Sequence, residues 1–64
     1  MKVYMGKKVI EREGKIRVRR LLRELGADEL TYLVIDRTRQ VLLTPDEMLD
    51  EDSEIELRKV TSGG

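Results

Sequence analysis

The sequence contains no cysteine and no histidine in 64 residues. These absences exclude a disulfide, a redox dithiol, a metal site of the Cys or His type, and a Ser-His or Cys-His nucleophile. Aromatic residues are scarce as well, with two tyrosines and neither Phe nor Trp, and there is a single proline. If the chain takes part in chemistry, we expect its reactive group to lie outside the ordinary catalytic side chains.

Long apolar runs are also missing. No stretch approaches the roughly 20 residues that span a bilayer, and the N-terminus has no signal-peptide pattern. We therefore expect a soluble, cytoplasmic protein. We also expect a single domain, because a chain of this length buries only about 60% of its unfolded surface. Asn is absent, Gln occurs once and 41% of the residues are charged. A surface of this composition is typical of a thermophile.

The net charge of zero conceals an uneven distribution. Residues 1–26 carry nine Lys or Arg and three Glu, whereas residues 27–64 carry four Lys or Arg and ten Asp or Glu. The acidic residues concentrate in 46–56, where seven of eleven side chains are acidic. This pattern indicates either two solvated faces of one small domain or a dipolar surface that orients partners by electrostatic steering.

Five short segments have the pattern of β-strands. Their expected ranges are 2–5, 8–12, 31–35, 41–43 and 55–60. Gly6 opens the turn between the first two strands, and Pro45 ends the fourth because proline cannot donate to a strand ladder. The stretch 46–53 has no periodic pattern, and we expect a surface connection anchored by Met48 and Leu49, with at most one helical turn.

Residues 17–25 have the only helical periodicity. Four apolar residues at positions i, i+3, i+4 and i+7 form one stripe: Val18, Leu21, Leu22 and Leu25. Gly26 follows, where a residue without a Cβ can close the helix in the left-handed conformation. A helix this short is marginal alone and must pack on the strands. We predict an α+β fold with one helix on one face of a mixed sheet of four to five strands, whose last strand lies centrally and parallel to the first.

The order of these elements, the helical motif 18–26, the run 49–57 and the terminal Ser62-Gly63-Gly64 resemble the β-grasp sulfur carriers and ubiquitin-like modifiers. This family of the ThiS/MoaD type includes the carriers for thiamin thiazole, molybdopterin and tRNA thiolation, and the small archaeal modifiers. The resemblance covers essentially the whole chain. It implies a β-grasp (ubiquitin-like) domain over 1–60 and a flexible C-terminal Gly-Gly tail over 61–64.

Two turns depart from the family pattern. The family often has Asn-Gly between the third and fourth strands, where this chain has the longer Asp36-Arg37-Thr38-Arg39. The frequent Asp-Gly-Asp before the last strand is replaced by Glu51-Asp52-Ser53. Asp tolerates the left-handed conformation that Gly would otherwise provide, so this turn is compatible with the fold. Neither change touches the terminal glycines.

The resemblance implies that the chain is a co-substrate and not an enzyme, and that it binds no metal or cofactor itself. It also implies that the reacting group is the carboxylate of Gly64. An adenylating enzyme of the ubiquitin-activating type would use ATP to activate it, and a sulfur donor would convert it to a thiocarboxylate for tRNA thiolation or for thiamin or molybdopterin biosynthesis. Gly63 and Ser62 would form the tail that enters the enzyme, since glycine lets a backbone approach channel walls closely. Three alternatives remain: a modifier joined through Gly64 to target lysines, a non-covalent interaction module, and a terminus without function.

One short helix cannot cover both faces of the sheet, so some apolar strand residues must be exposed. An exposed apolar patch beside a functional terminus favours a docking surface for partners, although loops or a second copy are alternative covers. The expected docking residues are Tyr32, Val34, Leu42, Arg58 and Val60. The resemblance also implies that acidic and apolar surfaces near the last strand meet the activating enzyme.

Other partners are not expected. A pI near 6.3 and the lack of aromatic residues among the basic ones argue against direct nucleic-acid binding. The acidic run Asp50-Glu51-Asp52 lacks the spacing of an EF-hand loop, which favours a solvated edge over a cation site. We expect a monomer when the protein is free.

Overall fold

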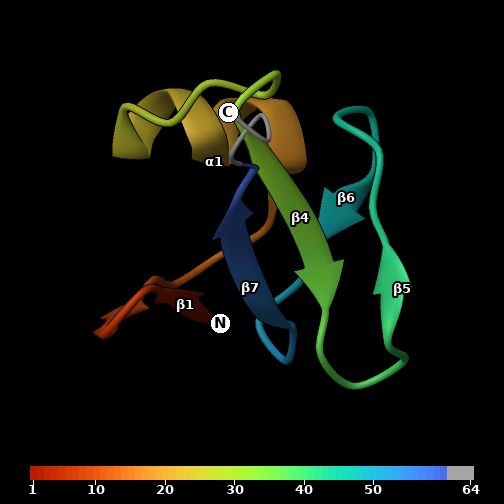
Figure 1. The fold of residues 1–64 in the computed structure, drawn as a ribbon. Coiled ribbons are helices and arrows are strands. Elements are labelled where there is room, and N and C mark those ends of the chain that lie inside the picture. The colour runs from red at the N-terminus through yellow and green to blue at the C-terminus, as the bar shows by residue number, and fades with distance from the viewer. Residues whose placement is uncertain (61–64) are drawn as a thin grey trace.

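The computed structural model describes residues 1–60, in which a five-stranded sheet lies against one helix (Figure 1). The strands are β1 (Lys2–Met5), β2 (Lys8–Glu11), β4 (Tyr32–Asp36), β5 (Val41–Leu42) and β7 (Glu54–Lys59). Their order is β2-β1-β7-β4-β5, with β1 and β7 parallel and the other neighbours antiparallel. The predicted α+β class, the mixed sheet and the central position of the last strand beside the first are confirmed.

The helix α1 (Val18–Leu25) begins one residue later than predicted and buries Val18, Leu21 and Leu22. Gly26 ends it at a φ of 68°, in the left-handed conformation that the sequence predicts. Its amide donates to the carbonyl of Arg23 at 3.2 Å, and the next amide, of Ala27, donates to the carbonyl of Leu22 at 2.8 Å. The last carbonyls of the helix are therefore satisfied by the backbone itself.

The start of α1 has no side-chain cap, and a distant loop supplies the acceptors instead. The amides of Val18 and Arg19 donate to the carbonyls of Glu47 and Pro45, both at 2.9 Å. The segment after Pro45 is thus tied to the helix by main-chain hydrogen bonds. It fixes where the N-terminal end of the helix sits.

This segment holds one of two short strands that the sequence pattern does not reveal, and the other comes directly before α1. β3 (Ile16–Arg17) and β6 (Met48–Leu49) pair antiparallel as a second, two-stranded sheet. The prediction of a surface connection over 46–53 is therefore wrong in part. Leu49 is only 3% exposed and anchors the segment in the core, whereas Met48 is 56% exposed and anchors nothing.

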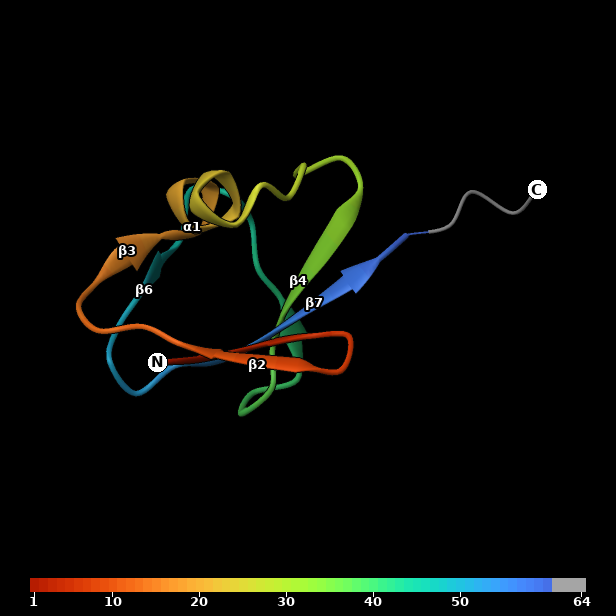
Figure 2. The same cartoon turned by 90° about the vertical axis from the view of Figure 1, so that its left-hand side faces the viewer.

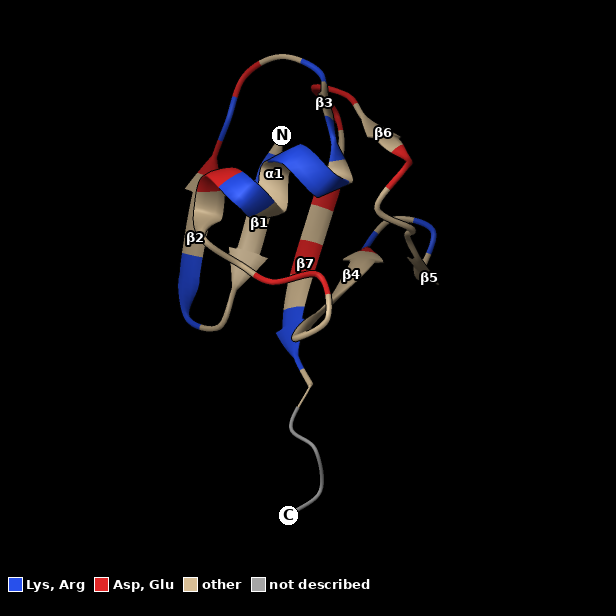
Figure 3. Cartoon of the chain, turned by 90° about the horizontal axis from the view of Figure 1, so that it is seen from above, with Lys and Arg blue, Asp and Glu red and all other residues tan. Residues whose placement is uncertain are grey.

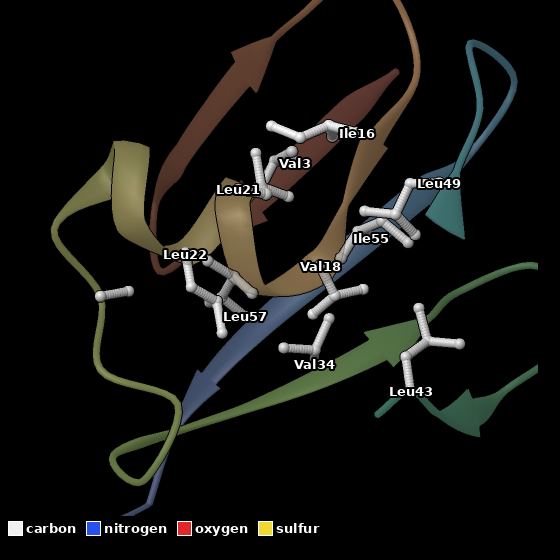
Figure 4. Close-up of a cluster of buried hydrophobic side chains, with 11 residues drawn as sticks. Val3, Ile16, Val18, Leu21, Leu22, Val34, Leu43, Leu49, Ile55 and Leu57 are labelled. Carbon is white, nitrogen blue, oxygen red and sulfur yellow. The ribbon is translucent and has the colours of Figure 1, made fainter. Parts of the chain in front are cut away.

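The core lies between α1 and one side of the sheet (Figure 4). Val3 of β1 and Ile55 of β7 are fully buried and face each other across the parallel pair. The members of the core are Val3, Ile16, Val18, Leu21, Leu22, Ala27, Val34, Leu43, Leu49, Ile55 and Leu57. No polar or charged side chain is buried among residues 1–60, so apolar packing alone fills this layer.

The turn between β4 and β5 is built around Asp36. One carboxylate oxygen, Oδ1, accepts hydrogen bonds from the amides of Thr38 at 2.9 Å and Arg39 at 3.2 Å. The other, Oδ2, accepts from Nε of Arg39 at 2.9 Å. Gln40 then takes a φ of 57° and donates its amide to the carbonyl of Asp36 at 2.7 Å. The turn expected between the third and fourth predicted strands is confirmed, with Gln40 in the conformation that glycine usually supplies.

Candidate functional site

The predicted reacting group and its tail, Gly64, Gly63 and Ser62, lie outside the described residues. The structure describes the point from which the chain continues toward them. Val60 follows the last residue of β7, and its amide donates to the carbonyl of Thr31 at 2.7 Å. The surface around this end of β7 is the described part of the molecule nearest in sequence to the predicted reacting group.

The side of the sheet opposite to α1 is covered by no helix or strand of residues 1–60 (Figure 2). We call it the open face. A row of paired residues crosses all five strands on this side, in the order Val9, Tyr4, Glu56, Ile35 and Leu42. Both ends of the row are apolar and exposed, Val9 at 55% and Leu42 at 63%. The open face therefore has a polar centre and apolar edges.

The polar centre is held by contacts among its own side chains. The hydroxyl of Tyr4 donates to Oε1 of Glu54 at 3.2 Å, and the guanidinium of Arg37 lies over the Tyr4 ring. Arg58 donates through Nη2 and Nε to Oε2 of Glu56, at 2.7 and 3.1 Å. Exposed ion pairs contribute little to stability. Their effect here is to fix the positions of four charged groups around one ring.

Three of the five predicted docking residues belong to the open face. Leu42 pairs with Ile35, and Arg58 pairs with Leu33, which places these side chains on the same side of the sheet. Val60, two residues after Arg58, continues the alternation and is 46% exposed. Leu33, Ile35, Leu42 and Val60 form what we call the apolar margin of the open face. Such an exposed margin beside the end of β7 fits an interaction surface.

The other two predicted docking residues lie on the helix side. Val34 pairs with Leu57 and is 5% exposed in the core, so its prediction as a docking residue is wrong. Tyr32 has the same parity in β4 and packs in part against the core, so it is not on the open face. The physical reason is the alternation of side chains along a strand, which the unbroken apolar run 32–35 conceals.

The predicted docking residues lack four residues of this surface, namely Tyr4, Leu33, Ile35 and Arg37. The apolar run 32–35 predicts Leu33 as an exposed residue if its odd-numbered rather than its even-numbered members are assigned to the open face. Tyr4 and Arg37 come together only because β7 lies between β1 and β4, and because the turn after β4 reaches back over the sheet. No sequence signal marks that approach.

The acidic run lies at the other end of β7. Asp50, Glu51 and Asp52 precede the strand, and Val60 follows it, roughly 20 Å away for six extended residues. Oδ1 of Asp50 accepts from the amide of Asp52 at 2.9 Å and from the hydroxyl of Ser53 at 3.2 Å, which makes the run a local turn. The run therefore lies near the last strand, where the resemblance implies an acidic surface, but at the end of β7 opposite to Val60.

A third charged feature links the end of β2 to the helix. Arg12 donates to both carboxylate oxygens of Glu24, at 3.0 and 3.1 Å. The hydrogen bond from Arg12 holds the pKa of Glu24 below its ordinary value, and the same bond raises the pKa of Arg12. Both groups stay charged near neutral pH. The pair fastens α1 to the sheet and does not border the open face.

Among residues 1–60, no group of three or more His, Cys, Asp or Glu side chains is arranged to hold a metal ion. Within residues 1–60 no helix is long and apolar enough to cross a bilayer.

A scan against models of protein families finds no match, and a search of curated proteins finds no significant match.

Proposed function

We propose that this protein is a small sulfur carrier of the ubiquitin-like, β-grasp type. In this proposal it is a co-substrate of an adenylating enzyme and performs no catalysis itself. One observation carries the proposal: β7, the central strand, passes from the packed core directly into residues 61–64, which end in Gly63-Gly64. Because β7 is paired along both of its edges, the point from which the chain continues toward the terminus is held in place.

The proposed chemistry needs no thiol on this chain. The carboxylate of Gly64 attacks the α-phosphorus of ATP, which forms an acyl-adenylate and releases pyrophosphate. The terminal sulfur of a persulfide then attacks the acyl carbon and AMP leaves, which gives an acyl disulfide. A second thiol reduces that disulfide and releases the thiocarboxylate. The lack of cysteine is consistent with this route, because the sulfur resides on the backbone terminus.

The open face supplies the second support. Its apolar margin (Leu33, Ile35, Leu42 and Val60) lies on the side of the sheet that α1 leaves uncovered, and three of the four residues are at least 42% exposed. Interfaces typically combine such an apolar patch with Tyr and Arg, as Tyr4 and Arg58 provide here. We propose that the adenylating enzyme and the later sulfur acceptor dock on this face in turn. The free protein is proposed to be a cytoplasmic monomer.

A ubiquitin-like modifier is the second candidate, because it would use the same terminal glycines and the same first activation step. In that case a lysine amine, rather than a persulfide, attacks the activated carbonyl and forms an isopeptide bond. The fold and the open face serve both candidates equally. The product on Gly64 is what separates them.

Intact mass spectrometry of the protein purified from its native host tests the proposal. A carrier gains about 16 Da at the C-terminus, for one oxygen replaced by sulfur. A modifier gives conjugates of higher mass that disappear on deletion of Gly64. The matched control deletes Gly63 and Gly64 and preserves residues 1–60. If the wild type shows neither the mass gain nor conjugates, and cellular thiolation is unchanged by that deletion, the proposal fails and a non-covalent interaction module remains.

A further inference from the structure

The two ends of the sheet carry opposite charge. A depression at the starting end of β7 is bordered by five carboxylates and two basic side chains: Glu11, Glu13, Glu51, Asp52 and Glu54, with Lys2 and Arg12. A depression that extends from Tyr4 on the open face to the finishing end of β7 is bordered by five basic side chains and one carboxylate: Lys7, Lys8, Arg37, Arg58 and Lys59, with Glu56. The Arg37 amide is bonded to Glu54 at the start of β7, so the basic residues at the finishing end itself are Lys7, Lys8, Arg58 and Lys59. Figure 3 shows basic segments where β2 begins and where β7 finishes, and an acidic segment where β7 begins.

The topology explains why the basic residues gather there. β1 and β7 are parallel, with Met5 opposite Leu57, so the turn that follows β1 lies at the same end as the residues that follow Leu57. That turn contributes Lys7, and β7 contributes Lys59. Both lysines are exposed. Residues more than 50 positions apart in the sequence are thereby brought to one surface, which we call the basic end.

The charge of the basic end is largely uncompensated. Glu56 is its only carboxylate among the bordering residues, and Glu56 is already paired with Arg58. Lys7, Lys8 and Lys59 form no ion pair with any of residues 1–60. Like charges held close together repel one another, so a partner of opposite sign is favoured at this end.

The basic end also has aromatic and apolar surface. Tyr4 and Tyr32 border it together with Met5, and exposed Val60 lies just beyond Lys59. Tyrosine and apolar surface surrounded by cations is typical of the centre and rim of a protein interface. This composition fits a protein surface with carboxylates around an apolar contact better than it fits a small anion.

We propose that the basic end docks on an acidic protein surface at the mouth of the adenylating site that receives Gly64. This inference rests on the proposed function, and it assigns docking to a basic surface, whereas the family resemblance implies acidic and apolar surfaces near the last strand. Attraction over this end would steer the C-terminus toward the enzyme, which acts on the rate of encounter more than on the chemical step. The acidic end, at the start of β7, faces away from the enzyme in this arrangement.

The test compares two double variants that change the net charge equally. Lys7→Glu with Lys59→Glu reverses the basic end, and Arg20→Glu with Arg23→Glu reverses two exposed residues of α1 that form no ion pair with residues 1–60. Adenylation is measured as pyrophosphate release with each adenylating enzyme of the source organism, at low and high salt. Circular dichroism melts check that both variants fold.

At low salt we expect the Lys7 and Lys59 variant to lose about tenfold in kcat/KM with kcat preserved, and the α1 variant to change by less than about twofold. High salt should bring the kcat/KM values of the wild type and of the Lys7 and Lys59 variant close to each other, because salt screens exposed charges. Equal losses in both variants, or no loss in either, overturn the inference while the proposed function stands. No adenylation of the wild type overturns both.

Binding to a fluorescent 20-nucleotide RNA supplies the competing outcome. RNA affinity that depends on Lys7 and Lys59, combined with normal adenylation of their variant, assigns the basic end to nucleic acid and overturns the inference. Weak, variant-independent RNA binding together with impaired adenylation supports the acidic protein partner.

Discussion

The guanidinium carbon of Arg37 lies 3.9 Å from the centroid of the Tyr4 ring, so the side chain of this residue, in the turn after β4, extends across β7 to a ring on β1. The Arg37 amide reinforces the crossing by donating to the carbonyl of Glu54 at 2.9 Å. This contact connects three strands on the open face. It also holds a cation above an aromatic ring at the centre of the proposed docking surface.

Replacing Arg37 with Ala tests the strength of this contact. We expect the free energy of unfolding to fall by about 0.5–1 kcal/mol, the range for an exposed cation–π pair. Urea unfolding of Arg37→Ala, Tyr4→Leu and the double variant gives the coupling energy between the two side chains. Additive losses in the double variant would show that the two side chains do not stabilise each other.

The conformation of Gln40 predicts a stabilising substitution. A non-glycine residue at a φ of 57° pays a steric cost that glycine avoids. We expect Gln40→Gly to raise the free energy of unfolding by about 0.5–1 kcal/mol in chemical denaturation. Thr38→Gly is the matched control in the same turn, at a residue with negative φ, and should lower stability. A destabilised Gln40→Gly variant would contradict the proposed strain.

Asp36 predicts an acid-sensitive turn. Burial acts to raise the pKa of Asp36, but hydrogen bonds from the Arg39 side chain and from the amides of Arg39 and Thr38 outweigh it and hold the pKa below its ordinary value. A depressed folded-state pKa means that the unfolded chain binds the proton more readily. The carboxylate therefore stabilises the fold above the unfolded value of about 4, and that stability is lost as the pH falls through the lower, folded pKa.

The measurement is the midpoint of urea unfolding between pH 6 and pH 2. We expect Asp36→Asn to be less stable than the wild type near pH 6, and the difference to shrink as the pH falls below about 4. The other carboxylates are common to both proteins and cancel in the difference. A difference that is constant over the whole range would assign the effect to lost geometry rather than to charge.

Much of the fold follows from local pattern. The stripe at Val18, Leu21 and Leu22, followed by Gly26, predicts α1 to within one residue, because a period of 3.6 and a left-handed end are local properties. The mixed sheet follows from the helix between the second and third predicted strands. β3 and β6 escape prediction because two residues are too few to show alternation, and their pairing joins positions more than 30 apart.

The candidate site was less predictable for a related reason. An unbroken apolar run such as 32–35 reveals a strand but not which side faces the helix, so Val34 was placed on the open face and Leu33 was missed. The acidic run and the lysines of the basic end are both visible in the sequence. Their separation to opposite ends depends on the parallel pairing of β1 with β7, a relationship between the two ends of the chain.

The apolar margin gives the prediction that bears most directly on docking. Leu42 and Met48 are exposed to similar extents, 63% and 56%, and each lies in a two-residue strand. Leu42 projects from the open face, whereas Met48 lies in the two-stranded sheet with β3. They form a matched pair for the substitutions Leu42→Gln and Met48→Gln, which remove apolar surface without adding charge.

Burying one leucine side chain at an interface contributes about 1.5 kcal/mol or more, equivalent to roughly tenfold in affinity. We therefore expect Leu42→Gln to raise the KM for adenylation about tenfold and Met48→Gln to leave it within about twofold, with melting temperatures close to that of the wild type in both. Pyrophosphate release at several protein concentrations separates KM from kcat. Equal KM values for the two variants would remove the open face from the docking surface, because the adenylating enzyme would then bind without covering Leu42.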